Sequence, residues 1–190
     1  ILFYVLSETG TALYINYRLR QNLGAPENWA IYGVSAFWLC MGVGRLLCAA
    51  IPEHWSNEFL ISITCLGGAA AMAAQTWCDT WVVSFAWFGV TGFLFAGAWP
   101  MIVGLTATRN PGNSGTVIGV TVATGALGCV VAPWMMNGLF AVVPPGTAFA
   151  FAALPLPIAA ALLAVLHRMP LAPRDVQRPA RSQSGGSVSV

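Results

Sequence analysis

Charged residues are scarce in this sequence. They make up only 7% of the 190 residues, whereas hydrophobic residues make up 57% and the mean hydropathy is +0.73. An average soluble domain carries about 25% charged residues, so the composition excludes a soluble fold. Lysine is absent, and four of the eight arginines lie in the last 23 residues. The formal net charge of +2 is too small and too local for a nucleic-acid-binding surface.

Metal-binding and catalytic patterns are also missing. The five cysteines stand singly in apolar stretches and form no Cys-x-x-Cys pair. The two histidines, His54 and His167, lie outside the expected spans, and neither a His-Glu-x-x-His nor a Gly-x-Ser-x-Gly motif occurs. The sequence therefore predicts no enzyme, no metal site and no cofactor. It opens on Ile1 without a Met or a positive leader, and we expect it to be part of a longer protein.

Long apolar stretches dominate instead. A helix needs about 20 apolar residues to cross the hydrocarbon core of a bilayer, and a barrel strand needs only about 10. The stretches have helical length, which predicts an all-α integral membrane protein with six transmembrane helices. We place these at 1–20, 29–51, 59–77, 81–106, 114–142 and 147–167, within a domain of residues 1–167. Residues 168–190 are rich in Pro, Ser and Arg, and we expect a disordered cytoplasmic tail.

The arginines predict the orientation. With six helices both ends of the chain face one side, and that side holds six arginines against Arg18 and Arg20 opposite. Positive residues favour the cytoplasmic side, so we expect an inner-membrane protein with both termini in the cytoplasm. The chain at Asn22 and Pro145 then faces outward. Three tryptophans would lie at the outer ends of helices, at the level that indole rings prefer: Trp29, Trp77 and Trp81.

Composition also predicts the surroundings of each helix. Small residues let helices approach closely, and the stretch 114–142 is rich in them, so we expect this helix to be buried between others. Its packing residues are Gly115, Gly119, Gly125, Gly128 and Pro133. The stretches 59–77 and 147–167 are plain and apolar, and we expect them to face lipid. A leucine at Gly119 should therefore disturb assembly with the missing part of the longer protein much more than a leucine at Ala160.

The helices at 1–20 and 81–106 hold polar and aromatic residues that the others lack. Glu8 and Asn16 lie on one face of the first, and Phe93, Trp99 and Pro100 belong to the second. Pro100 removes a helical hydrogen bond and can expose a carbonyl at a site or a hinge. We expect Glu8, Asn16, Phe93 and Trp99 to bind a solute. Glu8 and Trp99 should share a depth, roughly 10 Å inside the boundary at 1.5 Å per residue.

The intramembrane acid has two alternative roles. An ionisable group within a span costs at least a few kcal/mol, which favours a function for Glu8. If Ile1 lies at the boundary, however, Glu8 is near enough to the surface to snorkel or to form a structural pair. Arg45 is expected to anchor the end of its helix or to pair with Glu53. Arg109, at the end of a span, is expected to be solvated.

Four segments carry recognisable motifs. Residues 3–8 read Phe-Tyr-Val-Leu-Ser-Glu, residues 37–45 end in Gly-Arg, residues 98–101 read Ala-Trp-Pro-Met, and residues 113–134 are rich in glycine. In this order they resemble the seventh, eighth, tenth and eleventh helices of major facilitator superfamily transporters, especially the fucose-permease-like sugar branch. The seventh helix of that branch often reads Tyr-Val-Gly-x-Glu. Glu8 matches this pattern, and Leu6 departs from it.

This resemblance implies a function. Family members have twelve helices in two halves that rock around a central site, and each half is an inverted pair of three-helix units. The chain would be the carboxyl-terminal half of a secondary transporter that moves a small polar solute such as a sugar, with or without a proton. Arg45 and Pro100 would serve gating. The partners would be the missing six-helix half and the lipid bilayer. The alternative is a non-transporting membrane protein, or a truncated product, that only packs against other helices.

Overall fold

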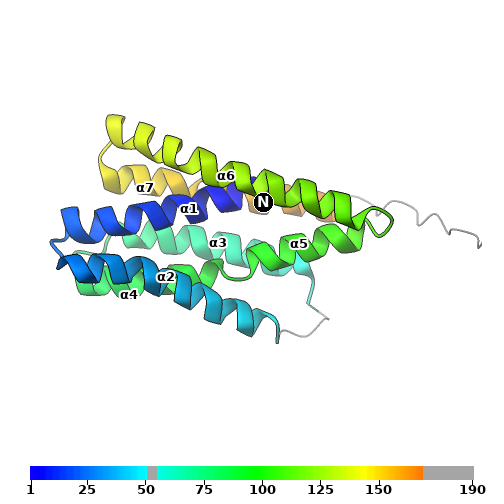
Figure 1. Cartoon of the computed structure of the whole chain (residues 1–190), viewed down its shortest axis with the longest axis horizontal. Helices are drawn as coiled ribbons and strands as arrows, with labels where there is room; N and C mark the ends of the chain where they lie inside the picture. Colours follow the sequence, from blue (N-terminus) through cyan, green and yellow to red (C-terminus); the bar gives the residue numbers. More distant parts are fainter. Residues whose placement is uncertain (51–54, 169–190) are drawn as a thin grey trace, which may run out of the picture.

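The computed structural model describes residues 1–50 and 55–168, which form helices joined by short turns (Figure 1). The elements are α1 (Leu2–Tyr17), the π-helix η1 (Arg18–Asn22), α2 (Glu27–Cys48), α3 (Asn57–Gln75), α4 (Trp81–Phe95), α5 (Ala98–Arg109), α6 (Ser114–Val142), α7 (Pro145–Ala153) and α8 (Pro155–Arg168). The described part of the chain contains no strand, which confirms the all-α class there. The expected tail lies outside the described residues from residue 169 onward.

Most of these helices can cross a membrane by their length and composition. Five segments are long and apolar enough, namely Glu27–Cys48, Asn57–Gln75, Trp81–Arg109, Ser114–Val142 and Pro145–Leu166. α1 is shorter, with 16 residues, but it continues directly into η1. Helices suit a bilayer because they satisfy their backbone polar groups without water. The helices therefore indicate a membrane protein.

Two of the expected spans are interrupted in the middle. α4 gives way to α5 at residues 96–97, one turn before Pro100. Pro100 has no N–H to continue the helical ladder, which accounts for a break at this point. α7 gives way to α8 at Leu154, directly before Pro155. The chain can therefore bend inside these two spans.

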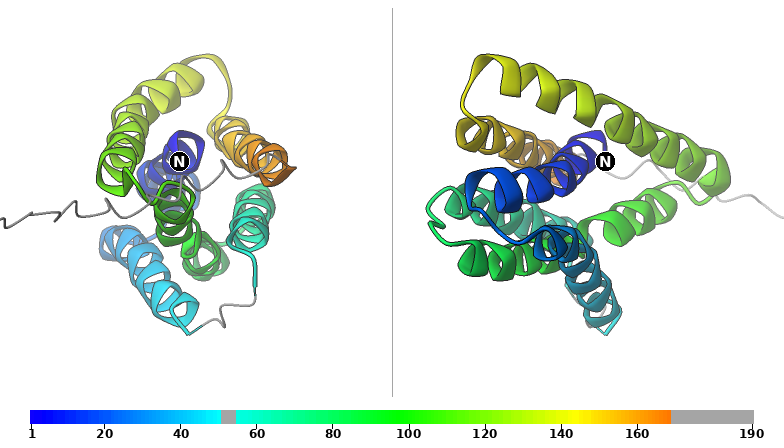
Figure 2. Two further views of the ribbon diagram at one scale, coloured as in Figure 1. Left: turned by 90° about the vertical axis from the view of Figure 1, so that its right-hand side faces the viewer. Right: turned by 60° about the vertical axis from the view of Figure 1, so that its left-hand side comes forward.

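α1 lies at the centre of the bundle. Figure 2 shows it surrounded by the other helices in the view along their axes. α1 packs mainly along α6, α2 packs along α4, and α3 packs along α8 as well as α4 and α5. The strongest pairings thus join helices that are not neighbours in the chain. Folding in this way brings polar residues together that are far apart in the sequence.

The burial of α8 differs from the sequence-based expectation. Within the described chain, few residues of α6 are buried, whereas Ala160 of α8 is only 7% exposed. The prediction of a lipid-facing α8 is therefore wrong at Ala160, and burial of α6 against the rest of a longer protein stays a prediction. Alanine permits close helix contact much as glycine does, and α8 uses its alanines to pack on α3 and α1.

One end of the bundle is rich in tryptophan. The rings of Trp29 and Trp81, from the first turns of α2 and α4, have centroids 5.6 Å apart. The Arg18 guanidinium donates to the Cys78 carbonyl at 2.9 Å and so ties η1 to the turn after α3. Burial raises the pKa of the Cys78 thiol in that turn, and the charge of Arg18 opposes the shift. This end therefore combines an aromatic surface with a fixed turn.

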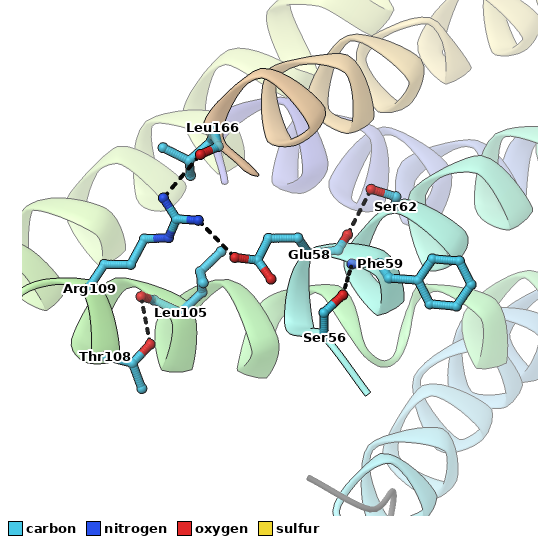
Figure 3. Close-up of polar contacts among 8 residues, drawn as sticks. All are labelled: Ser56, Glu58, Phe59, Ser62, Leu105, Thr108, Arg109 and Leu166. Atoms are coloured by element: carbon cyan, nitrogen blue, oxygen red, sulfur yellow. Dashed lines mark hydrogen bonds and ion pairs between the residues drawn. The ribbon is translucent and has the colours of Figure 1, made fainter. Parts of the chain in front are cut away.

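The opposite end is held by a second arginine. The Arg109 guanidinium donates to Glu58 Oε1 at 2.8 Å and to the Leu166 carbonyl at 3.1 Å (Figure 3). The Arg109 and Glu58 side chains are only 17% and 16% exposed. The expectation of a solvated Arg109 is therefore wrong, because α3 and α8 close over the end of α5. The predicted loop at Glu53 and His54 lies outside the described residues.

Candidate functional site

An ion pair joins a buried acid on α1 to a partly exposed arginine on α2. Arg45 Nη2 lies 3.4 Å from Glu8 Oε1. The Glu8 side chain is 7% exposed, whereas the Arg45 side chain is 40% exposed. Glu8 is separated from Asn22, the last residue of η1, by about 20 Å of helix at 1.5 Å per residue. The pair therefore lies far from the tryptophan-rich end, with its acid inside the bundle and its arginine at the edge.

The Arg45 side chain points into the bundle, away from the nearest end of α2. Its Nη2 also contacts Met41 Sδ at 3.2 Å, one turn back along the helix. Snorkelling from this position would require the opposite direction, past Cys48 and out of the bundle. The prediction that Arg45 anchors the end of its helix is therefore wrong. Glu53, its other predicted partner, lies outside the described residues.

The ion pair lies beside the break between α4 and α5. The Tyr4 hydroxyl, one turn before Glu8, donates to the Phe95 carbonyl at 2.9 Å and lies within interaction range of both charged groups. Phe95 is the last residue of α4, where the helical ladder of hydrogen bonds stops. Gly44 brings α2 close to the same break, because a Cβ there would collide with Ala96. A carboxylate, a guanidinium, a phenol and a main-chain carbonyl thus meet at one place.

Trp99 does not share the depth of Glu8. Its ring lies over Gly125, where an added Cβ would be 2.9 Å from the Trp99 ring and 3.6 Å from Ile1. Ile1 precedes Glu8 by two helical turns, about 10 Å along the axis. Figure 1 shows the N-terminus beside the middle of α6. The prediction is wrong because it takes Ile1 as one boundary of the span, whereas α5 and α6 extend well beyond that level.

Asn16 lies apart from the ion pair, whereas Phe93 lies closer to it. Both are exposed. Asn16 is two turns from Glu8, toward the end of η1, and Phe93 of α4 packs on Gly44, the residue before Arg45. Of the predicted site residues, the structure thus joins Glu8 to Arg45 and leaves Asn16 and Trp99 away from them.

The predicted packing residues of α6 fall into two groups. Gly125 lies against the Trp99 ring, and Gly128 lies against the main chain of α1. Gly115 and Gly119 are exposed, and within the described chain no atom lies within 4 Å of an added Cβ at either position. α6 continues through Pro133 without interruption. Two of the glycines therefore serve packing within this bundle, and the other two form an open surface.

Sequence reasoning missed a row of buried polar residues on α1. The Ser7 hydroxyl donates to the Ala152 carbonyl at 2.7 Å, and the Thr11 hydroxyl donates to the Ser7 carbonyl at 2.8 Å. Tyr4 belongs to the same row. Residues three and four apart share a helix face, so the spacing around Glu8 was a usable signal. The polar face of α1 is thus wider than one acid.

The class of this protein is inferred from its structure alone. No family model, curated protein or solved structure matches the chain. Within the described residues, no three His, Cys, Asp or Glu side chains gather where they could hold a metal ion. The fold and the site define a helical bundle with several helices apolar enough for a membrane. Its distinguishing feature is the ion pair between Glu8 of α1 and Arg45 of α2.

Proposed function

We propose that the chain is one six-helix half of a secondary transporter that moves a small polar solute across a membrane by alternating access. A sugar is the solute class that the sequence motifs imply. The Glu8–Arg45 pair carries the proposal. Ionisable side chains within a span cost at least a few kcal/mol, and they commonly pair and mark the path of a solute or ion. Here both side chains point into the bundle.

The interrupted span α4–α5 supports the same function. Transporter sites are typically formed at broken helices, because unwound backbone offers carbonyls to a bound solute or ion. The Phe95 carbonyl lies at such a break and accepts a hydrogen bond from Tyr4. A hydroxylated solute can replace either partner of this bond. Glu8, one turn away, can accept a proton that travels with the solute.

The packing of the spans is compatible with two inverted three-helix units. The first unit comprises α1, α2 and α3, and the second comprises α4–α5, α6 and α7–α8. The first span of each unit packs along the second span of the other, since α1 packs along α6 and α4 packs along α2. The third spans pack on each other through α3 and α8. Inverted repeats of this kind form halves that rock around a central site.

The open face of α6 is compatible with a missing six-helix half. Gly115 and Gly119 have no atom of the described chain within 4 Å of an added Cβ. The same face would serve a protein that only packs against other helices, which is the alternative function. Measurement of solute uptake separates the two functions.

Uptake into liposomes tests the proposal. The full-length protein that contains this chain, once reconstituted, should take up radiolabelled glucose or glucuronate faster than empty liposomes do. Glu8→Gln should lower uptake by about tenfold or more, because it removes one charge of the pair. Glu27→Gln is the matched control, since Glu27 pairs with Arg20 at the surface with its side chain 64% exposed. Uptake no faster than in empty liposomes, or uptake unchanged by Glu8→Gln, would contradict the proposal.

A further inference from the structure

Arg45 belongs to an open strip along one face of α2. Trp38, Gly42 and Arg45 are spaced four and three residues apart, which places them on the same side of the helix. The Trp38 and Arg45 side chains are 45% and 40% exposed. An added Cβ at Gly42 meets no atom of the described chain within 4 Å. The glycine therefore leaves an open space between an indole and a guanidinium.

The Arg45 guanidinium has more donors than the described chain uses. Its Nη2 contacts Glu8 and Met41. Its Nε is buried and has no hydrogen-bond partner among the described residues. A guanidinium presents five N–H groups in a planar fork, which matches the two oxygens of a carboxylate. Nε itself is covered, so the donors open to an acceptor-rich group are those on the exposed part of the Arg45 side chain.

Lipid does not suit the exposed part of Arg45. A guanidinium facing hydrocarbon is costly, and it usually escapes by snorkelling. Arg45 instead reaches back toward Met41, into the bundle. Of the two α-helices that pack on α2, α4 contains no Asp, Glu, Lys or Arg and α1 brings only Glu8. The exposed part of the Arg45 side chain therefore favours a negatively charged partner in addition to Glu8.

We infer that the transported solute carries a carboxylate, which binds Arg45 while the body of the solute occupies the space over Gly42 and packs on Trp38. The inference rests on the proposed function and narrows its solute class from sugars to acidic sugars and similar hydroxylated acids. Glu8 competes with the solute for Arg45. Displacement of the solute by Glu8 then provides a route to its release.

A matched pair of solutes tests the charge requirement. Glucuronate and glucose differ by a carboxylate in place of a hydroxymethyl group, and their binding to the full-length protein that contains this chain, purified in detergent, can be compared by equilibrium dialysis. Glucuronate should bind about ten to a hundred times more tightly, because a hydrogen bond to a charged group is stronger than a neutral one. Arg45→Gln should abolish this preference. Equal binding of the two solutes, or binding of glucose alone, would overturn the inference.

A second pair of variants tests the location. Gly42→Leu should fill the space beside Arg45 and weaken glucuronate binding about tenfold or more. Gly138→Leu is the control, because Gly138 is also exposed on a helix with no atom of the described chain within 4 Å of an added Cβ. Both variants should keep the elution profile of the folded protein. Equal loss of binding in both, or no loss in Gly42→Leu, would overturn the site.

The sign of the Glu8→Gln effect is a third test. Removal of the competing Glu8 carboxylate should strengthen glucuronate binding several-fold. Uptake should nevertheless become slower, because Glu8 can no longer displace the bound solute. A neutral solute held by Glu8 itself would bind more weakly to the same variant. Weaker glucuronate binding would therefore overturn the inference. Rapid glucose uptake without any glucuronate binding would overturn it as well and leave the proposed transporter standing, whereas absence of uptake contradicts the transporter itself.

Discussion

Single glycines determine how closely α2 and α4 approach. A Cβ at Gly92 would collide with the Phe37 carbonyl oxygen, and a Cβ at Gly44 would collide with Ala96. Small residues at such contacts allow the backbones of membrane helices to meet. The ion pair depends on this approach, because α2 carries Arg45 to the break in the α4–α5 span. The lack of a side chain at Gly44 and Gly92 thus allows α2 to hold the Arg45 guanidinium near the break.

Gly92→Ala should destabilise the protein, and Gly42→Ala should not. The Phe37 carbonyl belongs to the backbone of α2, so relief of the collision requires a shift of that helix, at a cost of about 1–3 kcal/mol. Gly42 faces open space, and alanine favours a helix over glycine by about 1 kcal/mol. Thermal unfolding in detergent, followed by tryptophan fluorescence, measures both changes. Equal midpoints for the two variants would contradict this account of the α2–α4 contact.

The acid of the ion pair was predictable from the sequence, and its partner was not. Glu8 is conspicuous because an acid in an apolar stretch is costly in any membrane fold. Arg45 is 37 residues away, and the direction of its side chain depends on how α2 lies against α1. Arg109 shows the same limit. Its partners Glu58 and Leu166 come together only when α3, α5 and α8 meet.

At the scale of helices, hydropathy predicts where apolar segments lie but not what surrounds them. Five segments long enough to cross a membrane fall in the predicted stretches, because each must be apolar along its whole length. The buried side of a helix depends instead on which partner it meets. Alanine allows close helix contact but does not indicate it, because alanine also suits a surface that faces lipid. No feature of the sequence therefore indicates that α8 packs on α3.

Ala160→Leu should destabilise the protein, whereas Ala161→Leu in the same turn of α8 should be neutral. Ala160 is 7% exposed and packs into the core, so a larger side chain there overpacks it by about 1–3 kcal/mol. Ala161 is exposed, and lipid accommodates a leucine there. Thermal midpoints and the yield of monodisperse protein provide the comparison. A lipid-facing α8, as the sequence alone predicts, would make the two variants indistinguishable.

The whole molecule has two chemically distinct ends, which fit the two surfaces of a membrane. One end carries the adjacent rings of Trp29 and Trp81, and such rings favour the headgroup level of a bilayer. The other end carries Arg109, held between α3 and α8 by Glu58 and the Leu166 carbonyl. Positive residues favour the cytoplasmic side, and the sequence predicts six arginines on the Arg109 side against Arg18 and Arg20 at the tryptophan-rich end. The tryptophan-rich end should therefore face outward.

Labelling of single cysteines tests this orientation. In a background without the five native cysteines, Asn22→Cys lies at the tryptophan-rich end and Gly112→Cys lies in the turn between α5 and α6, at the arginine end. Both positions are exposed, so the reagent can reach each one from its own side of the membrane. A membrane-impermeant maleimide should label Asn22→Cys in intact cells and Gly112→Cys only after permeabilisation, because the arginine end stays in the cytoplasm. The reverse pattern would invert the orientation. Labelling of both variants in intact cells would show that the bundle does not separate its two ends across a membrane.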